Sequence, residues 1–90
     1  MSEESAPLPR LRPPVSSAQL RLVIANIETR INLKNLEDDT PLKDAGADSL
    51  DFFNFILAVE DVCSIVIPSE DIYRVNTLGG MARYLNGRLS

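Results

Sequence analysis

The stretch that decides the fold is GADSLDFFNFILAVEDVC, which runs from Gly46 to Cys63. Its apolar residues recur at helical spacing, which predicts a helix from Ser49 to Cys63. Asp48 or Ser49 would cap this helix by accepting hydrogen bonds from its first free backbone N–H groups. With residues about 100° apart around the axis, one face gathers Phe52, Phe55, Ile56, Val59, Val62 and Cys63. We expect that face to form the core.

The opposite face of the same helix carries a second apolar stripe of Leu50, Phe53 and Leu57. Leucine and phenylalanine rimmed by polar and acidic residues are typical of a protein-docking surface, apolar for affinity and charged for steering. The alternative is that this stripe packs beneath the loop that precedes the helix. We expect an exposed partner-binding surface made of Asp51, Phe53, Asn54, Leu57 and Asp61.

The segments before this helix predict one more helix and a long loop. Apolar residues at i, i+3, i+4, i+7 and i+11 from Leu20 to Ile31 predict a helix over 17–32, with Ser16 or Ser17 as its N-cap. Residues 32–48 lack helical periodicity and are rich in turn formers. They predict an ordered loop whose inward anchors are Leu33, Leu36, Leu42 and Ala45.

The segments after Cys63 predict two shorter helices. Pro68 is followed by an acidic start and a helical turn or two, over 69–75. Thr77 then caps a last helix through Leu85, in which Gly79 and Gly80 cost about 1 kcal/mol each relative to alanine. The predicted fold is therefore all-α, a small four-helix bundle with three main helices, one short helix and a long first loop.

Four of the six prolines fall within the first fourteen residues, which predicts a flexible tail over 1–15 ahead of a folded domain over 16–90. Ninety residues are enough for one small core, with little room for a deep catalytic cavity. The apolar stretches are too short to cross a bilayer, and no signal-peptide pattern opens the chain. We expect a cytoplasmic monomer without a membrane partner.

The absent residues exclude several kinds of chemistry. Without histidine, triad hydrolysis and the usual zinc sites are disfavoured, and we expect no metal site. Cys63 is the single cysteine, so it forms no internal disulfide. Residues 37–61 hold eight acids and one lysine, a sum of -7. Such a block repels nucleic-acid phosphate and attracts basic protein surfaces, so we expect protein partners and no nucleic acid.

Ser49 stands at the head of the central helix, where the hydroxyl lies at the positive end of the helix dipole. The backbone N–H groups there suit a phosphate attached to that hydroxyl. Asp48 beside it has the carboxylate chemistry to help hold a divalent cation in a partner's active site. The alternative is that Asp48 and Ser49 only cap the helix.

The wider pattern of the chain resembles the acyl carrier protein family. A Gly-x-Asp-Ser-Leu-Asp segment opens the central helix, and Ala58-Val59-Glu60-Asp61 follows within it. Ile67-Pro68 precedes the acidic short helix, and 76–81 (Asn-Thr-Leu-Gly-Gly-Met) leads to Tyr84-Leu85. These motifs span 42–85 at the family's spacing, and the first helix matches in pattern.

The resemblance implies a four-helix carrier in which Ser49 is esterified by phosphopantetheine, flanked by Asp48 and Leu50. A phosphopantetheinyl transferase would supply the group from coenzyme A. Its thiol, and not Cys63, would carry an acyl or aminoacyl thioester from a loading ligase to a downstream transferase or synthase. The carrier would be a substrate of these partners and not an enzyme.

The chain departs from the fatty-acid type of this family at several positions. Asn54 replaces a common glutamate, Ile72 and Tyr73 interrupt a usually more acidic helix, and phenylalanines crowd the central helix. These changes predict a specialised carrier. The competing hypothesis is an acidic helical docking module without a prosthetic group. An enzyme with Ser49 as nucleophile is disfavoured, because no histidine serves as base and nearby carboxylates oppose an alkoxide.

Overall fold

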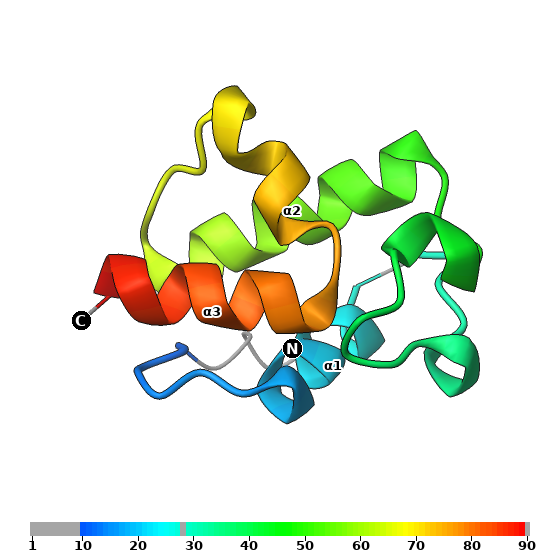
Figure 1. Cartoon of the computed structure of the whole chain (residues 1–90), viewed down its shortest axis with the longest axis horizontal. Coiled ribbons are helices and arrows are strands. Elements are labelled where there is room, and N and C mark those ends of the chain that lie inside the picture. The colour runs from blue at the N-terminus through cyan, green and yellow to red at the C-terminus, as the bar shows by residue number, and fades with distance from the viewer. Residues whose placement is uncertain (1–9, 28, 90) are drawn as a thin grey trace, which may run out of the picture.

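The computed structural model describes residues 10–27 and 29–89, and within them the chain is helical and contains no strand (Figure 1). No helix of this part of the chain is both long and apolar enough to cross a membrane. The elements in chain order are α1 (Ser17–Ala25), η1 (Leu33–Asn35), η2 (Leu42–Ala45), α2 (Ser49–Cys63), η3 (Ser69–Val75) and α3 (Leu78–Leu89), where η marks a 3-10 helix. The expected architecture of three main helices and one short helix is confirmed.

Helix α1 begins where the sequence predicts and ends seven residues early. Ser16 caps it, because its hydroxyl accepts the Gln19 N–H at 3.3 Å while the Gln19 side chain accepts the Ser16 N–H at 2.9 Å. The predicted end at residue 32 was wrong, since the helix stops at Ala25. The Asn26 side chain donates to the Leu22 carbonyl at 2.7 Å and caps the last turn.

The apolar residues that follow α1 in the sequence pattern still pack against the core, although they are not helical. Ile31 is buried and Ile27 is half-buried against the core, although both lie outside α1. The Thr29 hydroxyl accepts the Ile31 N–H at 3.3 Å, a local bond that competes with a helical one. Periodicity therefore identified the buried side chains correctly and extended the helix too far.

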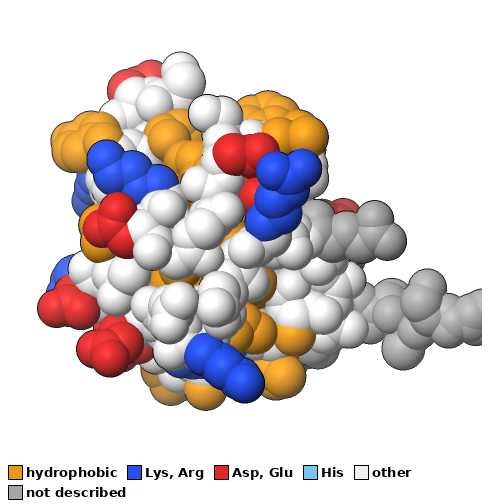
Figure 2. All heavy atoms as spheres, turned by 90° about the vertical axis from the view of Figure 1, so that its right-hand side faces the viewer, with side chains coloured by type: hydrophobic (Ala, Val, Ile, Leu, Met, Phe, Trp, Pro, Cys, Tyr) orange, Lys and Arg blue, Asp and Glu red, His pale blue; other side chains and the backbone are white. Residues whose placement is uncertain are grey.

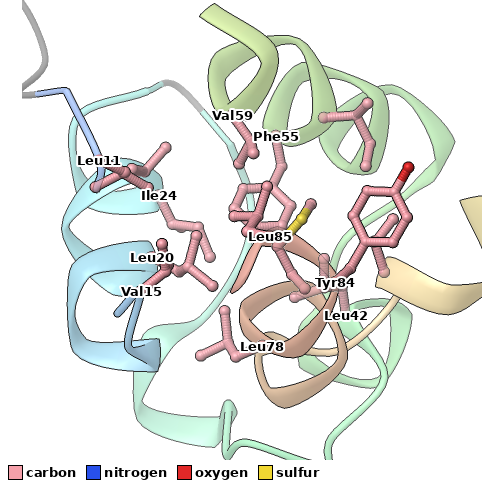
Figure 3. Close-up of a cluster of buried hydrophobic side chains, with 14 of the residues drawn as sticks. Leu11, Val15, Leu20, Ile24, Leu42, Phe55, Val59, Leu78, Tyr84 and Leu85 are labelled. Carbon is pink, nitrogen blue, oxygen red and sulfur yellow. The ribbon is translucent and has the colours of Figure 1, made fainter. Parts of the chain in front are cut away.

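Residues 10–15 belong to the packed bundle, in contrast to the tail expected over 1–15. Leu11 and Val15 are buried and point into the core beside α1 (Figure 3). The Leu11 N–H donates to the Val62 carbonyl at 3.2 Å, and the Asn86 amide bonds to both the N–H and the carbonyl of Val15, at 2.6 and 3.1 Å. The remainder of the expected tail, 1–9, lies outside the described residues.

The core is built around α2 and α3, with buried side chains added from α1, η2 and η3 (Figure 3), and Leu33 of η1 packs against it. The predicted core face of α2 is confirmed, because Phe55 and Val59 are fully buried and Phe52 alone of that set is half-buried. Cys63 is buried, and this burial raises the pKa of its thiol, which disfavours the reactive thiolate. The largest fully buried side chains are Phe55, Leu20, Leu36, Leu42, Leu78, Met81, Leu85, Val23, Val59 and Val75.

The long loop between α1 and α2 packs against the bundle through buried side chains and through hydrogen bonds to α1. Leu36, Leu42 and Ala45 are buried as predicted, and Leu33 is half-buried. The Arg21 guanidinium on α1 donates to the carbonyls of Leu33 and Leu36, at 2.7 to 3.4 Å. The loop therefore forms a firm support for the residues that lead into α2.

The two glycines at the start of α3 are there for close packing. The Gly79 N–H donates to the Asp38 carbonyl at 2.8 Å, and a Cβ on Gly79 would lie 3.0 Å from that oxygen. A Cβ on Gly80 would lie 2.6 Å from the Arg74 carbonyl oxygen. Thr77 caps the helix as predicted, with its hydroxyl accepting the Gly80 N–H at 2.9 Å. Glycine lowers the intrinsic helix propensity at both positions, but a larger residue would clash with these backbone oxygens.

Candidate functional site

The local sequence places Ser49 at the surface as the first residue of α2. Gly46 ends η2 with a φ of 98°, a left-handed conformation that favours glycine. The buried Ala47 donates its N–H to the Leu42 carbonyl at 3.2 Å, and Asp48 is extended. The chain then turns into the helix with the Ser49 side chain exposed.

Two carboxylates close a reciprocal cap around Ser49. Asp48 Oδ1 accepts the Asp51 N–H at 2.8 Å, and Asp51 Oδ2 accepts the Asp48 N–H at 3.2 Å. The Asp51 N–H, more than any other group, holds the pKa of Asp48 below its usual range. The cap that the sequence predicted at Asp48 or Ser49 is therefore provided by Asp48.

Asp51 does not lie where a docking residue is expected. Its side chain is turned into the cap, and the residue is only 7% exposed. Asp48 is exposed by contrast. Asp51 was expected on the partner-binding surface, and its burial argues against direct contact with a partner. The capping-box pattern of an acid three residues after the N-cap was the signal for this role.

Two cavities adjoin Ser49, and Phe52 lines both of them as well. The first has a volume of about 440 Å³ and is lined by Pro41, Leu42, Lys43, Ala47, Asp48, Ser49, Phe52 and Asn76. The second, of about 360 Å³, lies between α2 and η3 and is lined by Ser49, Phe52, Phe53, Ile56, Leu57, Glu60, Ile67, Ser69 and Ile72. The serine hydroxyl thus has space around it in two directions.

The apolar stripe of α2 lies on the helix face opposite the core, and it is exposed as predicted. Leu50, Phe53 and Leu57 are 65%, 56% and 47% exposed. Asp61 is exposed as well, and Asn54 is half-buried. The alternative in which the stripe packs beneath the loop was wrong. At the end of the molecule seen in Figure 2, apolar side chains lie at the surface beside side chains of both charges.

The residues around Ser49 fit a phosphate-linked group. Within residues 10–27 and 29–89 the Ser49 hydroxyl has no hydrogen-bond partner, so nothing in that part of the chain competes for it. The positive end of α2 and the Lys43 side chain, which lines the first cavity, both favour an anion there. The sequence supplies no histidine that could act as a base beside this hydroxyl.

Comparison with known proteins identifies the family. Residues 19–85 match the family model described as the phosphopantetheine attachment site. The chain belongs to this family. The carrier is also similar to an acyl carrier protein from Wolinella succinogenes, with 30% identity over 59 residues that cover 64% of this chain and 78% of that protein. The resemblance to acyl carrier proteins is confirmed.

Membership settles the prosthetic group and the general role of the molecule. The carrier bears covalently attached phosphopantetheine and works with partner enzymes, and carrier domains of this family are not catalytic. The hypothesis of a docking module without a prosthetic group is therefore not supported.

Two residues of this region were missed by the sequence analysis. Lys43 was read as an isolated cation within an acidic block, and no pattern marked it as a wall of the cavity beside Ser49. Glu60 fixes the turn after α2, because its Oε2 accepts the Ile67 N–H at 2.7 Å, and it also lines the second cavity. Its place in the segment Ala58 to Asp61, shared with the carrier family, was the available signal.

Proposed function

We propose that Ser49 is the attachment residue and that the carrier delivers an acyl group, held as a thioester, between partner enzymes. The observation that supports this is the exposed Ser49 hydroxyl at the head of α2, between two cavities and within the matched segment. The prosthetic group supplies the thiol that forms the thioester. The chain itself positions that group and performs no catalysis.

The partner-binding surface in this proposal is the exposed face of α2. Leu50, Phe53 and Leu57 supply apolar contact area, while Asp48 and Asp61 supply charge that steers basic partners. Asn54 lies among them, half-buried. The partners are a phosphopantetheinyl transferase, a loading ligase and a downstream transferase or synthase, which use the same face in turn. We place the carrier in the cytoplasm as a monomer that binds neither nucleic acid nor a membrane.

The second cavity favours an apolar acyl cargo. Its lining from Phe52, Ile56, Ile67 and Ile72 suits an aliphatic chain, whereas burial of an ammonium group is costly unless it is paired. Glu60 is the feature that would suit an aminoacyl cargo, since its carboxylate lies in this lining. It already accepts the Ile67 N–H, which reduces its capacity to pair with an ammonium.

The attachment is tested by intact mass after incubation with coenzyme A, magnesium and a broad-specificity phosphopantetheinyl transferase. We expect the wild type to gain one phosphopantetheinyl group and Ser49→Ala to gain none. Ser69→Ala is the matched control, because Ser69 is also exposed and lines the second cavity. We expect the Ser69→Ala protein to gain one phosphopantetheinyl group, as the wild type does. A modified Ser49→Ala protein would remove Ser49 from this role.

The cargo is tested by thermal melting of the carrier after loading. We expect an octanoyl thioester to raise the Tm above that of the holo form, because the chain fills apolar space, and a glycyl thioester to leave it unchanged. A higher Tm for the glycyl form alone would favour an aminoacyl cargo.

A further inference from the structure

The C-terminal part of the chain carries charge opposite to that of the acidic block. From residue 72 to the end the sequence holds three arginines and no acid, while residues 37–61 sum to -7. These arginines are Arg74 at the end of η3 and Arg83 and Arg88 on α3, and all three are exposed. The proposed attachment site does not use any of them.

Tyr84 organises two of the arginines. The guanidinium carbons of Arg74 and Arg88 lie 5.2 and 5.6 Å from the centre of the Tyr84 ring, within range of a cation–π contact. Arg88 also donates to the Tyr84 hydroxyl at 2.7 Å, and that hydroxyl donates to Asp71 at 2.8 Å. The ring therefore restricts both guanidinium groups, and for Arg74, which also lines the adjacent pocket, this lowers the entropy lost when it binds a ligand.

The charges in this cluster do not balance. Asp71 lies 3.8 Å from the Arg74 guanidinium, and its other oxygen accepts the Tyr84 hydroxyl. Among the described residues this is the ion pair of the cluster, so one carboxylate is set against the guanidinium groups of Arg74 and Arg88, and Arg83 adds a third positive charge on α3. The surplus of positive charge favours the approach of a further anion.

A small pocket of about 140 Å³ lies at this cluster, lined by Arg74, Gly80, Arg83 and Tyr84. We propose that it binds a carboxylate side chain from an acidic segment of a partner protein. Arg74 of η3 and Arg83 of α3 both line it, and the planar guanidinium group binds carboxylates with favourable geometry. The pocket is too small for an acyl chain, and the acidic block over 37–61 opposes an extended nucleic acid.

This pocket is separate from the proposed attachment site, because its lining shares no residue with either cavity beside Ser49. A partner that uses both surfaces would present basic residues to α2 and an acidic segment to the arginine pocket. The inference does not depend on the proposed function of Ser49.

The test is a titration of the full ¹⁵N-labelled chain with a hexaglutamate peptide, followed by the amide signals of Gly80 and Tyr84. We expect saturable shifts in the wild type and about tenfold weaker binding by Arg83→Gln, since a charge-assisted hydrogen bond is lost. Arg12→Gln is the matched control, because it removes the same charge at an exposed arginine outside the pocket and should bind as the wild type does.

Three results would overturn the proposal: no saturable shift, equal weakening in both variants, or saturation by inorganic phosphate with none by the peptide. Circular dichroism of Arg83→Gln confirms that it is folded, and Arg74→Gln provides a second test of the same pocket. Modification of Arg83→Gln with phosphopantetheine should match the wild type, so failure of the pocket and failure of the attachment site are distinguished by separate measurements.

Discussion

Asp48 and Asp51 are three residues apart and carry the same functional group, yet the fold places them in different surroundings. Asp48 is exposed, and its ionised form is favoured by the Asp51 N–H. Asp51 is buried, and its carboxylate accepts the Asp48 backbone N–H. A residue's contribution at this helix start thus depends on the direction of its side chain, which the residue type alone does not reveal.

The lowered pKa of Asp48 predicts a pH-dependent contribution to stability. Since its pKa is lower in the folded state, the ionised carboxylate stabilises the fold above its unfolded pKa, and this contribution is lost as the pH falls through the folded value. Asp48→Asn keeps an acceptor without the charge. We expect the Tm difference between wild type and variant to be largest at neutral pH and to shrink as the pH falls through the lowered pKa of Asp48.

Wild type and variant are compared at each pH, so any pH dependence that the two proteins share cancels in the difference between their Tm values. A difference in Tm that stays constant down to the acid limit would contradict the assigned role of the Asp48 charge.

Gly80 and Gly87 lie in the same helix and predict opposite responses to alanine. A Cβ at Gly80 would meet the Arg74 carbonyl at 2.6 Å, whereas nothing lies within 4 Å of a Cβ at Gly87. We expect Gly80→Ala to lower the free energy of unfolding by about 1–3 kcal/mol. Gly87→Ala should raise it by about 0.5 kcal/mol through helix propensity. Urea denaturation of both variants checks this, and equal effects would contradict the packing argument.

At the scale of the element, α2 has two apolar faces with different surroundings. The face with Phe55 and Val59 is fully buried, and the face with Leu50 and Phe53 is exposed. Helical periodicity identified both faces, and the structure confirms that the expected one is buried. The face with Phe55 and Val59 therefore contributes to the stability of the core, and the face with Leu50 and Phe53 is accessible from solvent.

Phe53→Ala and Phe55→Ala form a matched pair that tests this division. Phe55 is fully buried, so its truncation should cost about 3–5 kcal/mol of unfolding free energy. Phe53 is 56% exposed, and its truncation should cost about 0.5 kcal/mol while slowing transfer to and from partner enzymes. Denaturation and phosphopantetheinylation rates measure the two effects. A large loss of stability in Phe53→Ala would show that its face belongs to the core.

The elements of this fold were predictable where local signals agree with packing. The bounds of α2, the Thr77 cap and the loop anchors Leu36 and Leu42 follow from periodicity and capping patterns. The end of α1 was missed because the apolar pattern continued to Ile27 and Ile31, which are not helical. The packing of Leu11 was missed because it depends on a contact with Val62, a residue distant in the sequence.

The candidate site was predictable in its residue types and less so in its shape. The Asp-Ser-Leu segment and the apolar stripe were visible in the sequence. The two cavities were not, because they form between segments that meet only in the folded chain, as Lys43 and Asn76 do beside Ser49. The cluster around Tyr84 also joins η3 to α3 by side-chain contacts that no local pattern indicates.

At the scale of the whole molecule, the acidic block over 37–61 predicts a stability that depends on salt. Its net charge of -7 is self-repelling, and cations screen it. We expect the Tm to rise with added NaCl and with MgCl₂ from a low-salt, divalent-free buffer. Asp39→Asn, at an exposed position of this block, should raise the low-salt Tm and reduce its salt dependence. A Tm unchanged by salt would contradict this.

Residues 37–48, which lead into α2, hold five acids and one lysine, a sum of -4, whereas α3 carries Arg83 and Arg88 and no acid, and this separation of charge gives the molecule an electric dipole. In Figure 1 the loop that leads into α2 lies at one end of the long axis and the C-terminus at the other. The field of a basic surface exerts a torque on such a dipole and rotates the molecule before any contact forms. The end that carries Ser49 would then face a basic partner when the two proteins meet, and a larger fraction of encounters would have a productive orientation.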